Sequence, residues 1–288
     1  MVQKARYFAG KRCFITGAAS GIGRATALRL AAHGAELYLT DRHCDGLVQT
    51  VSDARALGAQ VPEHRALDVS DYDEVAAFGA DIHARHPSMD VVMNIAGVSV
   101  WGTVDRLTHD QWSNLVAINL MGPIHVIETL VPPMLAAGRG GHLVNVSSAA
   151  GLVALPWHAA YSASKYGLRG LSEVLRFDLA SHRIGVSVVV PGAVRTPLVN
   201  TVEIAGVDRQ DPNVSRWVGR FSNHAVSAEK AAEKILAGVA KNRYLIYTSH
   251  DIRVLYGFKR LAWWPYSVAM RRVNVVFTRA LRPGPVSR

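Results

Sequence analysis

The feature that most constrains the fold is a regular alternation of short apolar segments with longer amphipathic ones. Apolar runs of this length predict buried strands, whereas apolar residues three to four positions apart predict helices. Strands are expected at residues 12–16, 36–40, 60–67, 91–95, 141–146, 185–190 and 244–247. Helices are expected at residues 21–33, 47–57, 72–85, 110–137, 159–182 and 228–239. This alternation predicts an α/β fold with a doubly wound parallel sheet covered on both faces.

Two departures from regularity are expected. Pro132 and Pro133 are predicted to kink the long helix or to end its regular part. Residues 196–223 mix polar and bulky side chains without a clear period, which favours either a substrate-covering lid or an irregular surface insertion.

The chain has 288 residues, of which 49% are hydrophobic and 19% charged, so a large core is possible and global disorder is excluded. The length fits one domain with an appendage. Cys13 and Cys44 cannot form a disulfide framework. The 12 histidines show no metal-ligand spacing, so no metal site is expected.

The positive charge is concentrated at the C-terminal end of the sequence. Of the net charge of +10, residues 251–288 contribute eight basic residues against one Asp, which is +7. We therefore expect a catalytic domain at 1–250 and a basic, aromatic extension at 251–288. The extension fits an anionic membrane surface, packing on a neighbouring subunit or on its own substrate pocket, or disorder. Nucleic acid is disfavoured because no recognition motif accompanies the charge.

No signal peptide is recognised near the N-terminus, and no segment approaches the roughly 18–20 apolar residues of a spanning helix. We expect a cytoplasmic protein, with peripheral membrane contact through the extension as an alternative.

A glycine-rich turn, residues 16–23 (TGAASGIG), follows the first predicted strand and opens the first helix. Glycines there let the backbone approach a pyrophosphate, which the helix N-terminus favours. Asp41 ends the second strand, where a carboxylate can bind the ribose hydroxyls of NAD and repel the 2′-phosphate of NADP. Arg42 argues weakly for NADP, since it can pair with that phosphate.

Tyr161 and Lys165 are four residues apart on a predicted helix and therefore share a face. Tyrosine has an ordinary pKa of about 10, and a nearby ammonium is expected to lower it and make the phenol a usable acid or base. Ser148 ends the fifth strand 13 residues earlier, and Asn119 lies in the long helix.

With these residues in place, the chain resembles the classical short-chain dehydrogenase/reductase family over roughly residues 8–248. The family's TGxxxGxG motif matches residues 16–23, its NxAG motif matches residues 94–97, and its PG motif matches Pro191 and Gly192. The family's catalytic set matches Asn119, Ser148, Tyr161 and Lys165.

The resemblance implies a Rossmann-like fold and a hydride transfer with a nicotinamide cofactor. Tyr161 would be the general acid/base, Ser148 would stabilise the substrate oxygen, and Asn119 would hold a water that links Lys165 to solvent. Lys165 would also bind the nicotinamide ribose. The expected cofactor-binding residues are Gly17, Ser20, Gly21, Ile22, Gly23, Asp41, Arg42, Asp68, Val69, Asn94, Ala96, Gly97, Tyr161, Lys165, Pro191, Gly192, Val194 and Thr196.

The segment 149–157 (AAGLVALPW) is apolar and follows the catalytic strand. It predicts a hydrophobic secondary alcohol or ketone as substrate, although Trp157 can equally be a packing residue. We therefore expect an NAD-dependent oxidoreductase that forms a homodimer or homotetramer. The alternatives are a 3-oxoacyl thioester reductase using NADPH and, from another class, a non-catalytic nucleotide-binding or membrane-associated scaffold.

Overall fold

The computed structural model describes residues 7–198, 202–207 and 225–281. Its centre is a seven-stranded sheet in the order β11-β7-β6-β4-β1-β2-β3, with every neighbouring pair parallel. The strands are β1 (Arg12–Thr16), β2 (Glu36–Asp41), β3 (Glu63–Ala66), β4 (Val91–Asn94), β6 (Gly141–Val146), β7 (Ile184–Val190) and β11 (Leu245–Tyr247). The doubly wound α/β fold predicted from the sequence is confirmed.

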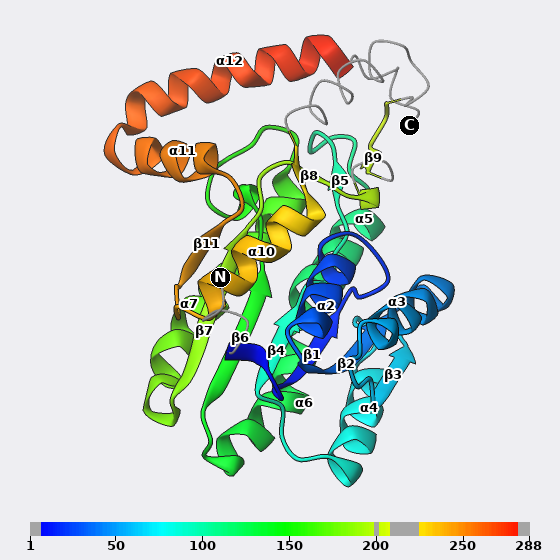
Figure 1. The fold of residues 1–288 in the computed structure, drawn as a ribbon. Helices are drawn as coiled ribbons and strands as arrows, with labels where there is room; N and C mark the ends of the chain where they lie inside the picture. Colours follow the sequence, from blue (N-terminus) through cyan, green and yellow to red (C-terminus); the bar gives the residue numbers. More distant parts are fainter. Residues whose placement is uncertain (1–6, 199–201, 208–224, 282–288) are drawn as a thin grey trace.

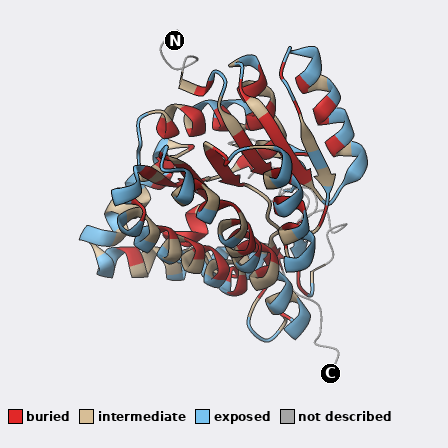
Figure 2. Cartoon of the chain, turned by 90° about the horizontal axis from the view of Figure 1, so that it is seen from below, coloured by how far each residue is buried: buried red, intermediate tan, exposed pale blue. Residues whose placement is uncertain are grey.

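Helices cover both faces of the sheet (Figure 1). One layer contains α2 (Gly21–Ala32), α3 (Cys44–Ala56) and α10 (Ala228–Val239), and the other contains α4 (Tyr72–Arg85), α6 (Gly122–Ala137) and α7 (Ala159–Asp178). The buried residues follow the strands and the inner faces of the helices, while the outer faces are exposed (Figure 2). From β1 the strand order runs through β2 to β3 on one side, and the chain then crosses back to add β4 on the other side of β1. Open α/β sheets bind ligands beyond the carboxyl ends of the strands at such a switch in strand order.

The long helix differs from its expected form. It consists of α5 (His109–Val116), a π-helical turn at Ala117–Met121, and α6, which continues through Pro132 and Pro133 to Ala137. The prediction that these prolines interrupt the helix is therefore wrong. Buried side chains on both sides of the prolines, among them Leu130 and Met134, pack into one core and hold α6 in place.

By length and composition, the run His109–Ala137 could also cross a membrane, so the expectation that no segment reaches that size is wrong. However, 50% of its most apolar window is buried inside the protein. Its apolar residues supply one layer of the core, and burial against the sheet is what their composition reflects.

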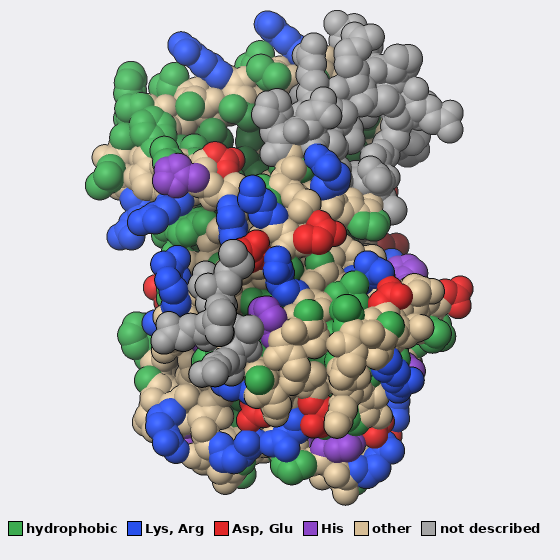
Figure 3. Space-filling view, viewed as in Figure 1, with side chains coloured by type: hydrophobic (Ala, Val, Ile, Leu, Met, Phe, Trp, Pro, Cys, Tyr) green, Lys and Arg blue, Asp and Glu red, His purple; other side chains and the backbone are tan. Residues whose placement is uncertain are grey.

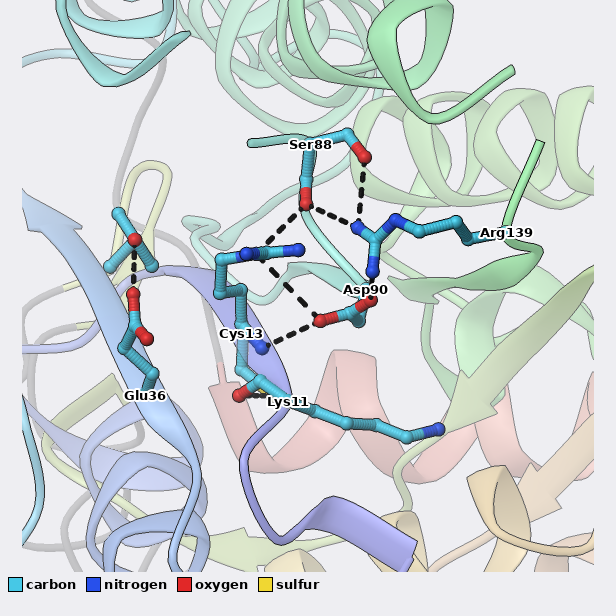
Figure 4. A network of polar contacts seen from close by, with 8 residues as sticks. Lys11, Cys13, Glu36, Ser88, Asp90 and Arg139 are labelled. Atoms are coloured by element: carbon cyan, nitrogen blue, oxygen red, sulfur yellow. Dashed lines mark hydrogen bonds and ion pairs between the residues drawn. The ribbon is translucent and has the colours of Figure 1, made fainter. Parts of the chain in front are cut away.

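A polar network joins the strand ends opposite the predicted site (Figure 4). The Asp90 carboxylate accepts hydrogen bonds from the backbone N–H of Arg12 and from the Arg139 guanidinium, each at 2.9 Å. The Ser88 carbonyl accepts from both arginine side chains at 3.0 Å. These contacts fix the starts of β1 and β4 relative to each other.

Two small parallel pairings lie outside the main sheet. β5 (Val100–Trp101) pairs with β9 (Glu203–Ile204), and β8 (Val194–Arg195) pairs with β10 (Val226–Ser227). Most of the predicted lid at 196–223 lies outside the described residues. Its described part at 202–207 is joined to the loop after β4 by the β5–β9 pairing.

The C-terminal extension forms two helices, α11 (His250–Leu261) and α12 (Trp263–Leu281). Both cross the end of the molecule at which the sheet strands finish (Figure 1). Ile252, Tyr266 and Leu281 are buried against the catalytic body. Of the alternatives considered for the extension, the structure therefore shows packing on its own chain.

Candidate active site

The four predicted catalytic residues are brought together at the carboxyl ends of the strands. Asn119 lies in the π-helical turn, Ser148 follows β6, and Tyr161 and Lys165 lie on α7. The Ser148 side chain lies close enough to Tyr161 to lower the pKa of the phenol, and its Oγ accepts from Ala150 N at 3.1 Å. A Cβ placed at Gly97 would meet Asn119 Oδ1 at 2.9 Å and Lys165 Nζ at 3.3 Å, so the loop after β4 lies directly against both groups.

Tyr161 carries a raised pKa, which is opposite to the direction expected from its lysine neighbour. Burial raises the pKa of the phenol, and the hydrogen bond with Ser148 partly offsets this by lowering it. Lys165 Nζ is 5.9 Å from the centre of the Tyr161 ring and donates to the Val146 carbonyl at 3.0 Å. In this arrangement, Ser148 is the group that stabilises the phenolate.

Lys165 is itself buried, and this burial lowers its pKa to about 8. An ammonium removed from water loses solvation, which favours the neutral amine. The side chain therefore changes charge near pH 8, with its Nζ 5.9 Å from the centre of the Tyr161 ring.

Asn119 fastens the loop after β4 to the catalytic helix. Its Oδ1 accepts from the Val98 N–H and its Nδ2 donates to the Val98 carbonyl, both at 2.9 Å. Nδ2 is also 3.3 Å from Ser164 Oγ. The water-holding role expected from the family stays a prediction, while the structure adds a positioning role. Sequence reasoning missed Ser164, whose only signal was its place between Tyr161 and Lys165.

Ser147 points away from the site, because successive side chains on a strand face opposite sides of the sheet. Its hydroxyl donates to the Lys165 carbonyl at 2.9 Å, inside the protein. Ser147 therefore positions α7 against β6, which leaves Ser148 as the serine that reaches Tyr161.

The glycine-rich turn has the shape expected for a pyrophosphate cradle. A Cβ on Gly17 would stand 2.8 Å from the Ala96 backbone, and one on Gly23 would stand 1.9 Å from the Gly17 carbonyl. Helix α2 begins after Ser20, which is exposed and makes no side-chain cap, and no acidic residue lies in its first turn. The first N–H groups of a helix have no partner within it, so this end is suited to an anion.

Thr196 lies against the same turn, because a Cβ on Gly21 would meet the Thr196 side chain at 3.1 Å. The Pro191 carbonyl accepts from Ala149 N at 2.8 Å, and Gly192 N is 3.3 Å from Thr248 Oγ1. Val194 is buried in β8. The segment after β7 therefore contacts both the glycine-rich turn and the residues that follow β6. A dinucleotide bound along this segment would span the same two places.

Asp41 lies at the end of β2 beside the glycine-rich turn. One carboxylate oxygen accepts from Ala19 N at 2.9 Å, and the other accepts from His43 N at 2.9 Å. Arg42 is exposed. The Asp41 carboxylate therefore supports the glycine-rich turn at the end of β2, an arrangement that fits a nucleotide held at this turn.

The remaining predicted cofactor residues make mostly structural contacts. Asp68 accepts from Ser70 N at 2.8 Å, and the carbonyl of buried Val69 contacts His125 Nδ1 at 3.0 Å. Asn94 is buried in the sheet, where it donates to Asn145 at 2.9 Å. Ile22 packs against the core beneath α2. Their contacts with a cofactor stay predictions.

An aromatic cluster adjoins Tyr161 on the substrate side. The His158 ring centre is 6.2 Å from that of Tyr161, 4.6 Å from Trp101 and 6.3 Å from Phe277 of α12. Burial lowers the pKa of His158 to about 4, so the imidazole is neutral at pH 7. Through Phe277, helix α12 thus reaches the aromatic cluster beside Tyr161.

Trp157 is 6% exposed and packs with Val202, Ile204 and Leu281. It has a φ of 66°, a left-handed conformation that bulky residues rarely adopt. The choice between packing and pocket lining is resolved in favour of packing, because its neighbours are the described lid residues and the last turn of α12.

Among the described residues, no cluster of His, Cys, Asp or Glu could hold a metal ion. The candidate site is therefore built from a hydroxyl, a phenol, an amine and an amide above a dinucleotide cradle.

Comparison with known proteins decides the family. The family model described as short chain dehydrogenase matches residues 11–205. The chain belongs to this family.

This dehydrogenase is 37% identical to the oxidoreductase SadH of Mycobacterium tuberculosis over 238 residues, which are 82% of this chain and 85% of SadH. It is 35% identical to the 3-oxoacyl-[acyl-carrier-protein] reductase FabG of Thermotoga maritima over 189 residues, 66% of this chain and 76% of that protein. Its fold matches a short chain dehydrogenase/reductase from Burkholderia phymatum, solved in complex with NAD. That match has a TM-score of 0.79, 27% identity and 98% coverage of each chain. The chain is thus an oxidoreductase of this family with a fold that binds a nicotinamide dinucleotide.

Proposed function

We propose that this dehydrogenase transfers hydride between NAD(H) and a hydrophobic secondary alcohol or ketone, with Tyr161 as general acid/base. The observation that carries the proposal is that Ser148, Tyr161 and Lys165 come together beyond the end of β6, with Lys165 Nζ 5.9 Å from the centre of the Tyr161 ring. The nicotinamide, when bound, supplies the hydride acceptor or donor. The protein supplies the proton and the position.

The roles of the residues follow from their contacts. In alcohol oxidation, Tyr161 takes the hydroxyl proton, and in ketone reduction it returns a proton to the oxygen. Ser148 donates to the same substrate oxygen and stabilises the charge that develops there. Lys165, with its pKa near 8, replaces the proton on Tyr161, and Asn119 keeps the loop after β4 at the correct distance.

The substrate class is supported by the surroundings of Tyr161. The ring contacts His158, which in turn contacts Trp101 and Phe277, and the neighbouring core cluster is apolar. Because His158 is neutral at pH 7, this aromatic cluster carries no charge that would attract an ionic substrate. A hydrophobic substrate gains the most from such surroundings.

Asp41 supports NAD rather than NADP. A buried carboxylate beside the glycine-rich turn would repel a 2′-phosphate, and its side chain is only 10% exposed. We expect NADH to bind at least about tenfold more tightly than NADPH, and Asp41→Asn to reduce that ratio. Calorimetric titration of both cofactors measures this, and tighter binding of NADPH to the unmodified protein would contradict it.

A 3-oxoacyl thioester reductase using NADPH is the second candidate, favoured by the similarity to FabG. Asp41 argues against this candidate, because its carboxylate would repel the 2′-phosphate of NADPH. The two candidates separate in one assay that offers secondary alcohols with NAD and 3-oxoacyl thioesters with NADPH.

Replacement of Tyr161 by Phe tests the chemistry. It removes the proton donor but keeps the ring, so kcat is expected to fall by about 10²–10⁴-fold with NADH binding unchanged. The matched control is Tyr166→Phe on the same helix, expected to stay within about twofold of the unmodified rate. Equal rates for the unmodified protein and Tyr161→Phe would contradict the proposal and favour a non-catalytic nucleotide-binding protein.

A further inference from the structure

The two helices of the C-terminal extension are held to the catalytic body on their inner side. The Tyr266 hydroxyl accepts from Ala154 N at 2.7 Å. Lys259 Nζ donates to the Leu152 carbonyl at 2.8 Å and to the Tyr166 hydroxyl at 2.7 Å. These contacts and the buried Leu281 identify the side of α11 and α12 that faces the catalytic body. The opposite side is called the outer face.

That outer face is strongly apolar. On α11, Val254, Phe258 and Leu261 follow one another at helical spacing and are 57%, 39% and 90% exposed. Trp263 and Trp264 at the start of α12 are 63% and 76% exposed. With Val275 and Val276, this short extension holds seven of the fifteen large apolar side chains that are exposed in the described part of the chain.

The same face is basic. Arg271 and Arg272 are exposed on α12 between Trp264 and the exposed valines, Arg279 is exposed one turn after them, and Arg260 is exposed on α11. The sequence has no Asp or Glu after Asp251. Figure 3 shows hydrophobic side chains gathered where α11 meets α12, with Lys and Arg side chains above and below them.

A cavity of about 540 Å³ adjoins α11 and adds to this charge. It is lined by Lys234, Lys241, Arg243, His250 and Arg253, among others. Positive charge therefore lies beside the first turn of α11 as well as along α12.

We propose that the outer face of α11 and α12 binds an anionic lipid surface, with Leu261, Trp263 and Trp264 inserted among the headgroups. Tryptophans and leucines flanked by arginines are the composition of an interfacial helix, because indole rings favour the headgroup region and guanidinium groups pair with lipid phosphates.

Charge argues against a second copy of this chain as the occupant. A two-fold symmetric contact places the same patch against itself, so arginines would face arginines. Helix α12 contains no carboxylate that could pair with them. An anionic bilayer supplies the missing negative charge.

The test uses the full chain and sedimented vesicles of phosphatidylcholine alone or mixed with phosphatidylglycerol. The unmodified protein should bind the mixed vesicles, with affinity falling as salt rises. Leu261→Asp combined with Trp264→Asp should lower this binding by at least about tenfold. Replacing Arg271, Arg272 and Arg279 by Gln should lower it by a similar factor.

The matched control adds the same two carboxylates elsewhere. Val48 and Leu57 on α3 and its C-terminal cap are 52% and 53% exposed, so Val48→Asp with Leu57→Asp should leave vesicle binding unchanged. Circular dichroism and light scattering check that each variant is folded and report its oligomeric mass.

The proposal is overturned if the unmodified protein does not bind the mixed vesicles. It is overturned as well if the Leu261→Asp, Trp264→Asp variant and the Val48→Asp, Leu57→Asp variant bind them equally. It is also overturned if Leu261→Asp with Trp264→Asp changes the oligomeric mass and leaves vesicle binding intact, which would make this face a subunit interface. Vesicle binding does not require hydride transfer, so an inactive Tyr161→Phe protein should still bind. Failure of the proposed chemistry is thereby distinguished from failure of the membrane surface.

Discussion

At the scale of single residues, burial sets the chemistry of the site more than charge pairing does. Tyr161 has its pKa raised by burial, and the opposing influence comes from Ser148 rather than from Lys165. Lys165 has its own pKa lowered to about 8 for the same reason, loss of solvation. The helical spacing of Tyr161 and Lys165 was visible in the sequence, but the depth of the site below the surface was not.

The raised pKa of Tyr161 predicts a pH dependence. Oxidation needs the phenolate, so its rate should climb as pH rises toward the tyrosine pKa, whereas reduction needs the phenol and should stay level until the pH approaches that pKa. Ser148→Ala removes the hydrogen bond that lowers this pKa. Its oxidation profile, measured as kcat/KM from pH 6 to 10, should therefore move to higher pH with a lower maximum. An unmoved profile would show that Ser148 does not tune Tyr161.

At the scale of elements, the cofactor cradle depends on close backbone approaches between segments that are distant in sequence. The turn before α2 meets the loop after β4 at Gly17 and the segment after β7 at Gly21, and neither glycine leaves room for a side chain. The order of strands, with β1 next to β4, is what places these three segments together.

Gly23→Ala should damage the cradle specifically. The added methyl would lie 1.9 Å from the Gly17 carbonyl, so the start of α2 must move away from the turn. We expect the affinity for NADH, measured by fluorescence titration, to fall by at least about tenfold.

Gly257→Ala on α11 is the matched control, because its methyl would meet nothing within 4 Å. It should leave NADH affinity unchanged and stabilise the helix by about 0.5–1 kcal/mol. Equal NADH affinity of both variants would contradict the proposed role of the turn.

At the scale of the whole molecule, the described surface has two apolar regions with different character. The outer face of α11 and α12 is apolar and basic. On α7, the exposed residues Ala163, Gly170, Val174 and Phe177 lie along one helix face without added arginines. We propose that this α7 face, in which Phe177 is 75% exposed, joins two copies of the chain in a homodimer or homotetramer.

Phe177→Glu should therefore dissociate the oligomer. A like charge placed on both sides of a two-fold contact repels itself and loses the apolar burial. Light scattering at micromolar concentration should report a multiple of the 31.2 kDa chain mass for the unmodified protein and a smaller mass for the variant. Leu57→Glu on the opposite side of the sheet serves as the control, and a monomeric unmodified protein would refute the assignment.

The sequence by itself determined the α/β alternation, the glycine-rich turn and the Ser, Tyr and Lys positions, because periodicity and motif spacing are local properties of the chain. Only the tertiary structure decided three other features. Helix α6 passes through Pro132 and Pro133 because its packing holds both halves in line. Asn119 binds Val98 because a π-helical turn aims it there. The extension covers the catalytic end because Tyr266 and Leu281 find buried partners more than 70 residues away in sequence, which no local pattern could reveal.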